Sequence, residues 1–463
     1  MITRIEIDGF KTFQDFKLEL TPFQVIVGPN GVGKSNLFDT MRLLSRLADD
    51  DLRSAFGELR GEAGELFTMM PDGFPMPCMR LAAEMLVEPT VQDSWGAQAT
   101  IRFTRLRYEL EIHRRADEQG LERLYVTKES LMPIKRSDDG WFKRHSRQAG
   151  DRRQQPLKAG RSKPFISTEQ EGDVATIYQH QDGHGGRKAS RADRIERTML
   201  SGVANTEFPH VFAAREEMRH WRFLHLNPEV LHQPSSMLAN PSVLPDGGNL
   251  PSALARMQGE DPLLLGDVAR DLSNLVPGII SVSVEKDIPG NRYVVGVTTQ
   301  DGRTFSSRVL SDGTLRLLAL ATLRNDPEHR GVMCFEEPEN GLHPFRLEKM
   351  VHLLRGLATD FSDPDQESLP LRQLLVNTHS PLLVSQPDVV KDVLVAYVAT
   401  RVVPGQSSSM RVTRIVPMSL DPRLEIPLGV DDAEVTYTRD QAIKYLTTMD
   451  ATDALAALQA AAV

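Results

Sequence analysis

The chain has 463 residues, of which 40% are hydrophobic and 25% are charged, and its formal net charge is −9. This composition is typical of a soluble globular protein with more than one domain, and the negative balance argues against a protein whose whole surface coats nucleic acid. No apolar run approaches the roughly 20 residues of a membrane-spanning helix. Cys78 and Cys334 are the only cysteines, so we expect no disulfide framework and a reducing, cytoplasmic location.

The first 50 residues predict three strands followed by a helix. Ile2–Ile7 alternates between apolar and polar residues, which we interpret as an edge strand, and Phe16–Leu20 alternates again. Phe23–Val27 is a short apolar run, and Lys34–Leu47 carries apolar residues at helical spacing. The string Gly28-Pro-Asn-Gly-Val-Gly-Lys-Ser35 therefore stands between a strand and a helix, which is the setting of a phosphate-binding P-loop.

The P-loop pattern predicts a site for ATP and Mg²⁺. Its glycines let consecutive backbone N–H groups point at phosphate oxygens, and the helix N-terminus adds positive potential. Lys34 would reach the β- and γ-phosphates, and the Ser35 hydroxyl would be a ligand of Mg²⁺. The alternative is a glycine-rich turn without nucleotide, but chance gives this pattern in only about 1–2% of chains of this length. The predicted nucleotide contacts are Asn30, Gly31, Gly33, Lys34, Ser35 and Asn36.

The middle of the chain carries less information. The pattern is strand-like from Met79 to Leu131, whereas residues 133–194 are polar and basic and predict an insertion or a poorly ordered loop. Eight basic residues and one acidic residue lie between Lys143 and Lys163. A solvated loop is the simplest interpretation of this run, and a patch that binds DNA phosphates is the alternative.

The second half of the chain again mixes strands with helices. Helical patterning over residues 195–275 precedes two paired strands, Ile279–Val284 and Tyr293–Thr298, and an apolar helix, Thr314–Leu323. We therefore predict an α/β fold: a P-loop core with a mixed or parallel sheet, an antiparallel β layer and an inserted helical lobe. The expected domains are a core of residues 1–50 and 300–425, a β-rich part at 51–132, a basic, flexible insertion at 133–194, a helical lobe with a strand pair at 195–300 and a helical tail at 426–463.

Two further motifs supply groups that ATP hydrolysis needs. The apolar strand before Glu336 ends in two adjacent carboxylates: Glu336 is placed to hold Mg²⁺, and Glu337 is placed to deprotonate the attacking water. The usual residue at the first position is Asp, so Glu336 is one methylene longer. His379 follows the apolar strand Leu374–Asn377 and could sense the γ-phosphate. Each motif alone would more often be structural, but the combination with a P-loop is specific.

The string Leu310-Ser-Asp-Gly-Thr314 precedes the apolar helix. A serine hydroxyl and glycine amides at a helix N-terminus can bind an anion, although Ser311 or Asp312 could equally be an ordinary helix cap. The order of the motifs favours the first interpretation, because this loop comes before the carboxylate strand and His379 comes after it.

Together these motifs resemble the ABC-type ATPases of the SMC and RecF group, and within that group the stand-alone ATPases related to the overcoming-lysogenization-defect (OLD) ATPases. The resemblance covers roughly residues 1–50 and 215–400. It is carried by Gly9-Phe-Lys-Thr-Phe13, Gly28–Asn36, Leu310-Ser-Asp-Gly-Thr-Leu-Arg316, Phe335-Glu-Glu-Pro-Glu-Asn-Gly-Leu-His-Pro344 and Asn377-Thr-His-Ser-Pro381. The strings Phe223–Pro228 and Asp246–Leu250 also look like family strings, without an assigned chemistry.

The resemblance implies a homodimer or higher oligomer in which two heads enclose two ATP molecules. Ser311 and Gly313 would then contact the ATP that is held by the other subunit, and Lys11 would approach the nucleotide. The chain has no long coiled coil, and the 84 residues that follow His379 contain no Asp-x-Asp pair such as TOPRIM nucleases use, so we expect any nuclease activity to come from a partner.

Several functions fit these features. The first is a nucleotide-dependent dimeric switch that senses or controls a separately encoded effector, such as a nuclease or toxin, in anti-phage defence. The second is a RecF-like, DNA-binding ATPase that uses the Lys143–Lys163 run. A transporter ATPase or a scaffold that binds ATP without hydrolysing it are weaker alternatives.

Overall fold

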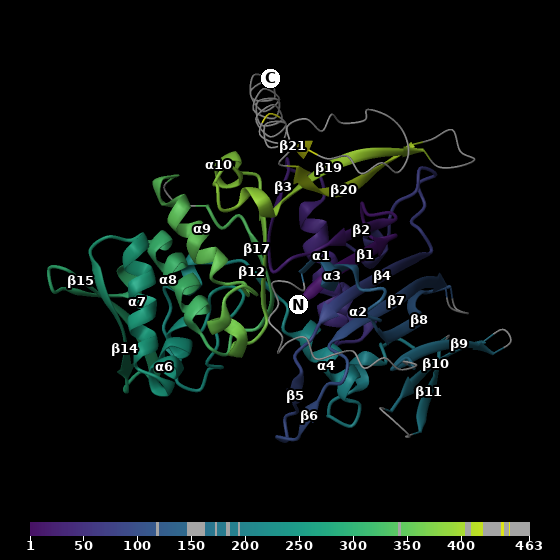
Figure 1. Ribbon diagram of the computed structural model, residues 1–463, viewed down its shortest axis with the longest axis horizontal. Helices are drawn as coiled ribbons and strands as arrows, with labels where there is room; N and C mark the ends of the chain where they lie inside the picture. Colours follow the sequence, from purple (N-terminus) through teal and green to yellow (C-terminus); the bar gives the residue numbers. More distant parts are fainter. Residues whose placement is uncertain are drawn as a thin grey trace.

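The computed structural model of the chain describes residues 1–116, 120–145, 163–171, 174–181, 186–192, 195–340, 344–402, 409–419, 437–438 and 444 (Figure 1). Within these residues the strands form an eight-stranded, a seven-stranded and a four-stranded sheet and a small two-stranded hairpin. The seven-stranded sheet lies in the middle of the molecule, between the eight-stranded sheet and a layer of helices (Figure 1).

The central sheet brings the ends of the motif-bearing strands together. Its order is β12-β17-β18-β3-β19-β20-β21, and the contacts from β12 to β19 are all parallel. Because the carboxyl ends of parallel strands meet at one edge, the residues that follow β3, β17 and β18 are neighbours. The strands are β12 (Arg222–Leu224), β17 (Gly331–Glu336), β18 (Arg372–Thr378), β3 (Phe23–Val27), β19 (Val393–Val402), β20 (Ser409–Ser419) and β21 (Tyr437–Thr438).

The eight-stranded sheet is antiparallel, with the order β11-β10-β9-β8-β7-β4-β1-β2. Strand β1 pairs with both β2 and β4, so the prediction of an edge strand at Ile2–Ile7 was wrong. Alternation reports that one face is buried and says nothing about the number of neighbouring strands. The strands are β1 (Ile2–Asp8), β2 (Phe16–Glu19), β4 (Cys78–Leu86), β7 (Arg105–Ala116), β8 (Glu122–Pro133), β9 (Ile166–Glu171), β10 (Val174–His180) and β11 (Arg187–Arg191).

Strands β9 to β11 correct the prediction of a loop or insertion over residues 133–194, since they extend this sheet at its β8 edge. The period-2 signal was weak because few side chains there are apolar, although Ile166 and Ile177 are buried. Most of the basic Lys143–Lys163 run lies outside the described residues, and so does most of the predicted helical tail at 426–463.

Helices and a smaller sheet cover the other face of the central sheet. The four-stranded sheet consists of β13 (Ser235–Ser236), β14 (Ile279–Asp287), β15 (Arg292–Thr299) and β16 (Thr304–Ser306), and it confirms the predicted β14–β15 pair. The longer helices on this side are α6 (Leu250–Glu260), α7 (Leu263–Leu275), α8 (Asp312–Asn325) and α9 (Leu347–Arg355). The remaining helices are α1 (Lys34–Leu47), α2 (Leu52–Gly57), α3 (Gly140–His145), α4 (Pro209–Arg219), α5 (Pro228–Leu231) and α10 (Pro381–Val384), and the hairpin is formed by β5 (Thr90–Gln92) and β6 (Gln98–Thr100).

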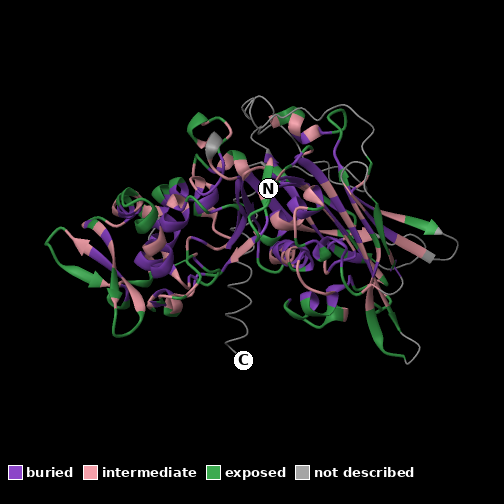
Figure 2. Ribbon diagram, turned by 90° about the horizontal axis from the view of Figure 1, so that it is seen from below, coloured by how far each residue is buried: buried purple, intermediate pink, exposed green. Residues whose placement is uncertain are grey.

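Two hydrophobic cores flank the central sheet. Every residue of β3 is buried, and its side chains alternate between the cores: Ile26 faces α1 and the eight-stranded sheet, whereas Val25 and Val27 face α6 to α9. Figure 2 shows the buried residues gathered around these central strands and the exposed ones at the tips of the outer sheets. The predicted α/β class, with a P-loop sheet, an antiparallel layer and a helical lobe, is therefore confirmed.

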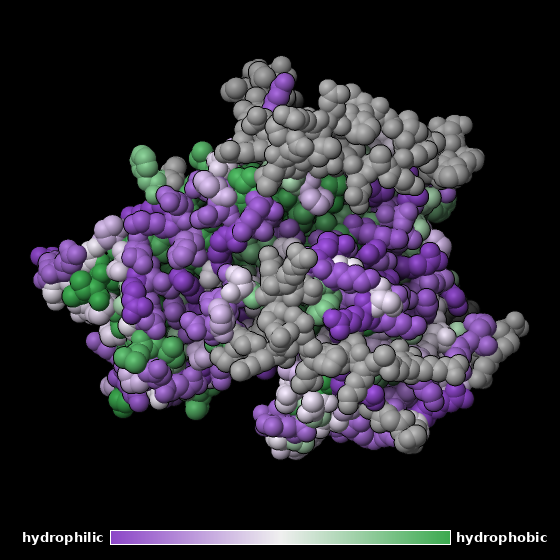
Figure 3. Space-filling view, viewed as in Figure 1, coloured by the Kyte–Doolittle hydropathy of each residue, from purple (hydrophilic) through white to green (hydrophobic). Residues whose placement is uncertain are grey.

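The described surface seen in Figure 3 is mainly hydrophilic, with hydrophobic side chains in small, separate patches. Among the described helices, none combines the length and the hydropathy that are required to cross a lipid bilayer.

Candidate functional site

The P-loop joins β3 to α1, as the sequence predicts, and glycine is required at its turns. Gly31 and Gly33 have φ angles of 76° and 97°, a region that side chains with a Cβ rarely adopt. The Nζ atom of Lys34 donates to the carbonyl oxygens of Gly28 (2.6 Å) and Pro29 (2.8 Å). The ammonium group thus lies inside the loop, at the N-terminal end of α1, where phosphates would bind.

Two threonines that sequence reasoning missed hold the P-loop from outside. The hydroxyl of Thr413, on β20, donates to the carbonyl of Val32 (2.7 Å) and lies 2.6 Å from the Thr12 hydroxyl, which accepts from the amide of Asn36 (2.9 Å). A Cβ atom on Gly33 would collide with both threonine hydroxyls. No local pattern could have shown this clamp, because it joins residues 401 positions apart.

Ser35 and Glu336, the predicted metal ligands, are brought together by Asn377. The Nδ2 atom of Asn377 lies 3.4 Å from the Ser35 hydroxyl and 3.4 Å from the Oε1 atom of Glu336. Its Oδ1 atom is buried and has no hydrogen-bond partner among the described residues. Hydroxyl, carboxylate and amide oxygens are the donors that Mg²⁺ prefers, so the residues at this edge fit the predicted metal.

Glu337 and His379, the two predicted catalytic residues, are in direct contact. The Oε1 atom of Glu337 lies 2.7 Å from Nδ1 of His379, and its Oε2 atom accepts from the amide of Asn340 (2.5 Å). Glu337 has a φ angle of 48°, and its backbone N–H donates to the carbonyl of Asn377 (2.7 Å). A non-glycine residue in this region costs about 1–3 kcal/mol, and such residues cluster at functional sites.

Ser311 and Gly313 lie at the start of α8 and do not belong to the hydrogen-bond network that joins these groups in the described part of the chain. The Ser311 hydroxyl accepts from the backbone N–H of Thr314 (3.3 Å) and therefore caps the helix, and it is exposed to solvent. In the described part of the chain, neither residue forms a hydrogen bond with the P-loop or the carboxylates of the same chain. Asp312 lies 3.0 Å from Nε2 of His232, and this contact raises the pKa of His232.

Comparisons with known proteins decide the family. Residues 101–385 match a family described as "AAA domain, putative AbiEii toxin, Type IV TA system", and residues 1–76 match the family "AAA ATPase domain". This chain belongs to the first of these two AAA families, whose match covers more than half of its residues. The first match includes the Ser311 loop, the carboxylates and His379, and the second includes the P-loop.

The similar proteins include a chromosome partition protein and SMC head domains. A segment of 132 residues is 28% identical to the chromosome partition protein Smc of Bordetella petrii, and the match covers 28% of this chain and 10% of that protein. An Smc head bound to the C-winged helix domain of ScpA is 14% identical with a TM-score of 0.48, over 90% of this chain and 98% of that chain. The SMC head domain from Thermotoga maritima is 13% identical with a TM-score of 0.35, over the same shares of both chains.

Lys11 of this AAA protein has a carboxylate partner on the P-loop helix. Its Nζ atom lies 2.8 Å from Oδ2 of the buried Asp39, and Arg60 contacts the same carboxylate at 3.3 Å. Lys11 itself has a φ angle of 45°, at the turn after β1. The predicted approach of Lys11 to a nucleotide would therefore require it to leave or share this ion pair.

A pocket of about 470 Å³ opens beside the two carboxylates, and residues without a predicted role line it. His225 and Asn227, from the string Phe223–Pro228, line this pocket together with Arg316 and the two carboxylates, Glu336 and Glu337. Arg316 also donates to the carbonyl of Asn340 (2.8 Å). The family-like string before α5 therefore forms one wall of the site, which sequence reasoning could indicate only as a resemblance.

A third carboxylate, Glu339, was also missed. It accepts a hydrogen bond from the hydroxyl of Thr378, the residue before His379. Burial raises the pKa of Glu339, and its Oε2 atom has no hydrogen-bond partner among the described residues. Its spacing in the string Phe335-Glu-Glu-Pro-Glu339 was the available signal.

Proposed function

We propose that this AAA protein binds and hydrolyses ATP and acts as a nucleotide-dependent dimeric switch. The observation that carries the proposal is the contact of Glu337 with His379, next to Ser35, Asn377 and Glu336 at the ends of three adjacent parallel strands. These groups bring together what phosphoryl transfer to water requires: a phosphate cradle, oxygen ligands for a metal and a base beside the attacking water.

Each residue has a defined task in this proposal. Lys34 and the P-loop N–H groups bind the phosphates, and Ser35 and Glu336 would hold Mg²⁺. When bound, Mg²⁺ neutralises charge on the phosphate oxygens. Glu337 orients the attacking water and accepts its proton. His379 fixes the Glu337 carboxylate through Nδ1, which leaves Nε2 to face the terminal phosphate.

The dimer supplies the part of the site that one chain lacks. Ser311 is an exposed residue that caps α8 without a hydrogen bond to its own P-loop, so we assign Ser311 and Gly313 to the ATP of the facing subunit. The helix N-terminus would then add positive potential at the terminal phosphate. Two heads would close on two ATP molecules and separate after hydrolysis.

The process that the switch controls is proposed from the family description, which names a putative toxin of a type IV toxin–antitoxin system. We propose a role in anti-phage defence in which the ATP state of the dimer controls a separately encoded effector. Affinity purification from the native host, in the ATP and ADP states, tests this part. An effector should co-purify in only one of the two states, and its absence from both would contradict the role.

Nucleotide-dependent assembly tests the central proposal. We expect the Glu337→Gln variant to bind ATP and Mg²⁺ but to hydrolyse ATP at least about a hundredfold more slowly than the unchanged protein. Light scattering should show that this variant is a dimer with ATP and not with ADP. Glu348→Gln, an exposed position on α9, is the matched control and should hydrolyse ATP like the unchanged protein. A monomer in both nucleotide states would contradict the switch, and normal hydrolysis by Glu337→Gln would contradict the assignment of the base.

DNA binding is the second candidate function. Arg187, Lys188 and Arg191 are exposed on the edge strand β11. In addition, one of the similar proteins is named a chromosome partition protein. Binding through such cations should weaken steeply with salt. Duplex DNA binding that is insensitive to salt, or not detectable with ATP present, would remove this candidate.

A further inference from the structure

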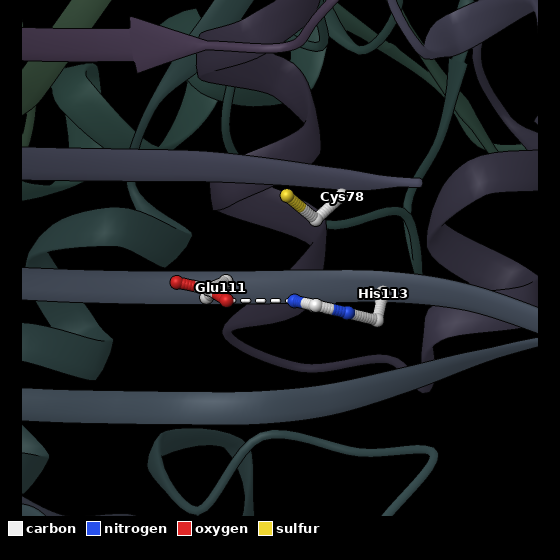
Figure 4. Close-up of side chains that lie close together, drawn as sticks. All are labelled: Cys78, Glu111 and His113. Carbon is white, nitrogen blue, oxygen red and sulfur yellow. Dashed lines mark hydrogen bonds and ion pairs between the residues drawn. The ribbon is translucent and has the colours of Figure 1, made fainter. Parts of the chain in front are cut away.

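Three side chains of different chemistry meet on the eight-stranded sheet, outside the nucleotide site. Cys78 begins β4 and lies directly opposite His113 of the neighbouring strand β7. Glu111 precedes His113 by two positions, so both side chains are on the same face of the sheet. Figure 4 shows the thiol close to the Glu111–His113 pair.

The donor atoms are close enough to share one ion. The possible ligand atoms of Cys78, Glu111 and His113 all lie within 4.8 Å of one another, and Nε2 of His113 is 2.7 Å from Oε1 of Glu111. Two ligands of a tetrahedral zinc ion lie roughly 3.3–3.8 Å apart, given bonds of about 2.0–2.3 Å. Small side-chain rotations would therefore reach the required geometry without movement of either strand.

We propose that Cys78, Glu111 and His113 form a binding site for a divalent transition metal of the zinc class. A thiolate and an imidazole select such a metal over Mg²⁺, which prefers oxygen ligands. With three protein ligands the fourth position would hold water or a group from a partner. This site is chemically distinct from the Ser35–Glu336 site.

The simpler alternative is a hydrogen-bonded network that needs no metal. Arg80 donates to the Oε2 atom of Glu111 (3.0 Å) and lies 3.6 Å from Asp8. The Arg80 side chain is 59% exposed, however, so it can move into solvent when a cation approaches. A metal bound here must also displace the thiol proton. Burial raises the pKa of Cys78, and affinity should therefore increase with pH.

The start of β4, which carries Cys78, adjoins the turn that carries Lys11 and Thr12. A Cβ atom on Gly9 would lie only 2.5 Å from the carbonyl oxygen of Cys78, so the start of β4 and this turn are in close contact. An ion at Cys78 would link β4 to β7 at the end of β4 that contacts this turn.

Cobalt binding to the untagged full-length chain tests the proposal, because Co²⁺ replaces Zn²⁺ and its bond to a thiolate gives a characteristic ultraviolet charge-transfer band. We expect about one Co²⁺ per chain with this band, and displacement by Zn²⁺ but not by Mg²⁺. Cys78→Ser should abolish the band, and His113→Asn and Glu111→Gln should each weaken binding at least about tenfold. Cys334→Ala, at the other cysteine, should retain the band.

Arg80→Gln keeps all three ligands, removes the competing cation and should tighten binding. It therefore tests the site even where a ligand variant folds poorly, and retained ATP binding reports folding in each variant. No band in the unchanged protein, a band that survives Cys78→Ser, or unchanged affinity in both His113→Asn and Glu111→Gln would each overturn the proposal.

Discussion

The Oε1 atom of Glu337 lies 2.7 Å from the Nδ1 atom of His379, although the two residues belong to the ends of different strands. The contact forms because β17 and β18 are parallel and in register, with Glu336 opposite Asn377. One carboxylate is thereby fixed by an imidazole and by the amide of Asn340. A base that is held in this way loses little freedom when it binds water, which favours proton transfer.

This contact predicts that Glu337 and His379 act as a unit. Glu337→Gln and His379→Gln should each reduce kcat for ATP hydrolysis by about 10²–10⁴-fold. The double variant should be little slower than the worse single variant, because residues in one hydrogen-bonded pair are not additive. Steady-state hydrolysis by the four proteins of this cycle provides the measurement. Fully multiplicative losses would show that the two residues act independently.

Asn377 should act as a positioning residue for the metal ligands. Asn377→Ala removes the amide between Ser35 and Glu336, so we expect the Mg²⁺ concentration for half-maximal hydrolysis to rise about tenfold. Nucleotide binding without Mg²⁺ should change little, because Lys34 and the loop are intact. An unchanged Mg²⁺ requirement with a lower kcat would instead indicate a general loss of structure.

Local sequence patterns could identify only those site residues that directly follow an apolar strand or belong to the glycine-rich P-loop string. Gly33, Lys34 and Glu337 follow apolar strands, and their roles were predicted from that position together with the P-loop pattern. Asn377 and Thr413 were not predicted as site residues, because their partners come from segments hundreds of positions away. A buried hydroxyl on one side of a strand leaves no periodic signal, so the P-loop clamp becomes visible only in the assembled sheet.

The clamp predicts that a change on β20 weakens nucleotide binding. Thr413→Val keeps the side-chain shape but removes the hydroxyl that donates to the carbonyl of Val32. We expect a loss of about 1–3 kcal/mol in the free energy of unfolding and a several-fold weaker affinity for ATP. Denaturant unfolding and nucleotide titration measure the two effects. Thr400→Val, at an exposed position on β19, is the control and should change neither.

Glu129 predicts how stability depends on pH. Burial raises the pKa of Glu129 from its ordinary value of 4.5 to about 7, against the opposing effect of hydrogen bonds from Met199, Leu200 and Tyr108. Between these two pH values the folded state holds a proton that the unfolded state has lost. This contribution to stability is therefore complete below about pH 4.5 and is lost as the pH rises through about 7.

The Glu129→Gln variant isolates this contribution. Between pH 5 and pH 8 the unchanged protein should lose roughly 2–3 kcal/mol more of its free energy of unfolding than Glu129→Gln, because one pKa unit corresponds to about 1.4 kcal/mol. The comparison uses the pH dependence and not the absolute stability, because the new amide faces two backbone donors, the N–H groups of Met199 and Leu200. Glu285→Gln, an exposed position on β14, should keep the pH dependence of the unchanged protein. Parallel curves for all three proteins would contradict the raised pKa.

The composite site predicts that two inactive chains restore activity when they are mixed. Lys34→Ala destroys the P-loop of its own chain but leaves the Ser311 loop intact. Ser311→Asp can still cap α8, while its negative charge would repel the phosphate of the facing ATP. In a mixed dimer, the P-loop of the Ser311→Asp chain faces the normal Ser311 loop of the Lys34→Ala chain, so one of the two sites is complete.

We therefore expect each variant alone to be inactive. An equimolar mixture should recover up to about a quarter of the normal rate of ATP hydrolysis. Random pairing makes about half of the dimers mixed, and each mixed dimer has one complete site of two. Mixing Lys34→Ala with the Ser311→Asp, Glu337→Gln double variant is the control, because the one intact P-loop of that mixed dimer then lacks its base and no complete site can form. A mixture that stays inactive while light scattering shows mixed dimers would place Ser311 outside the ATP site.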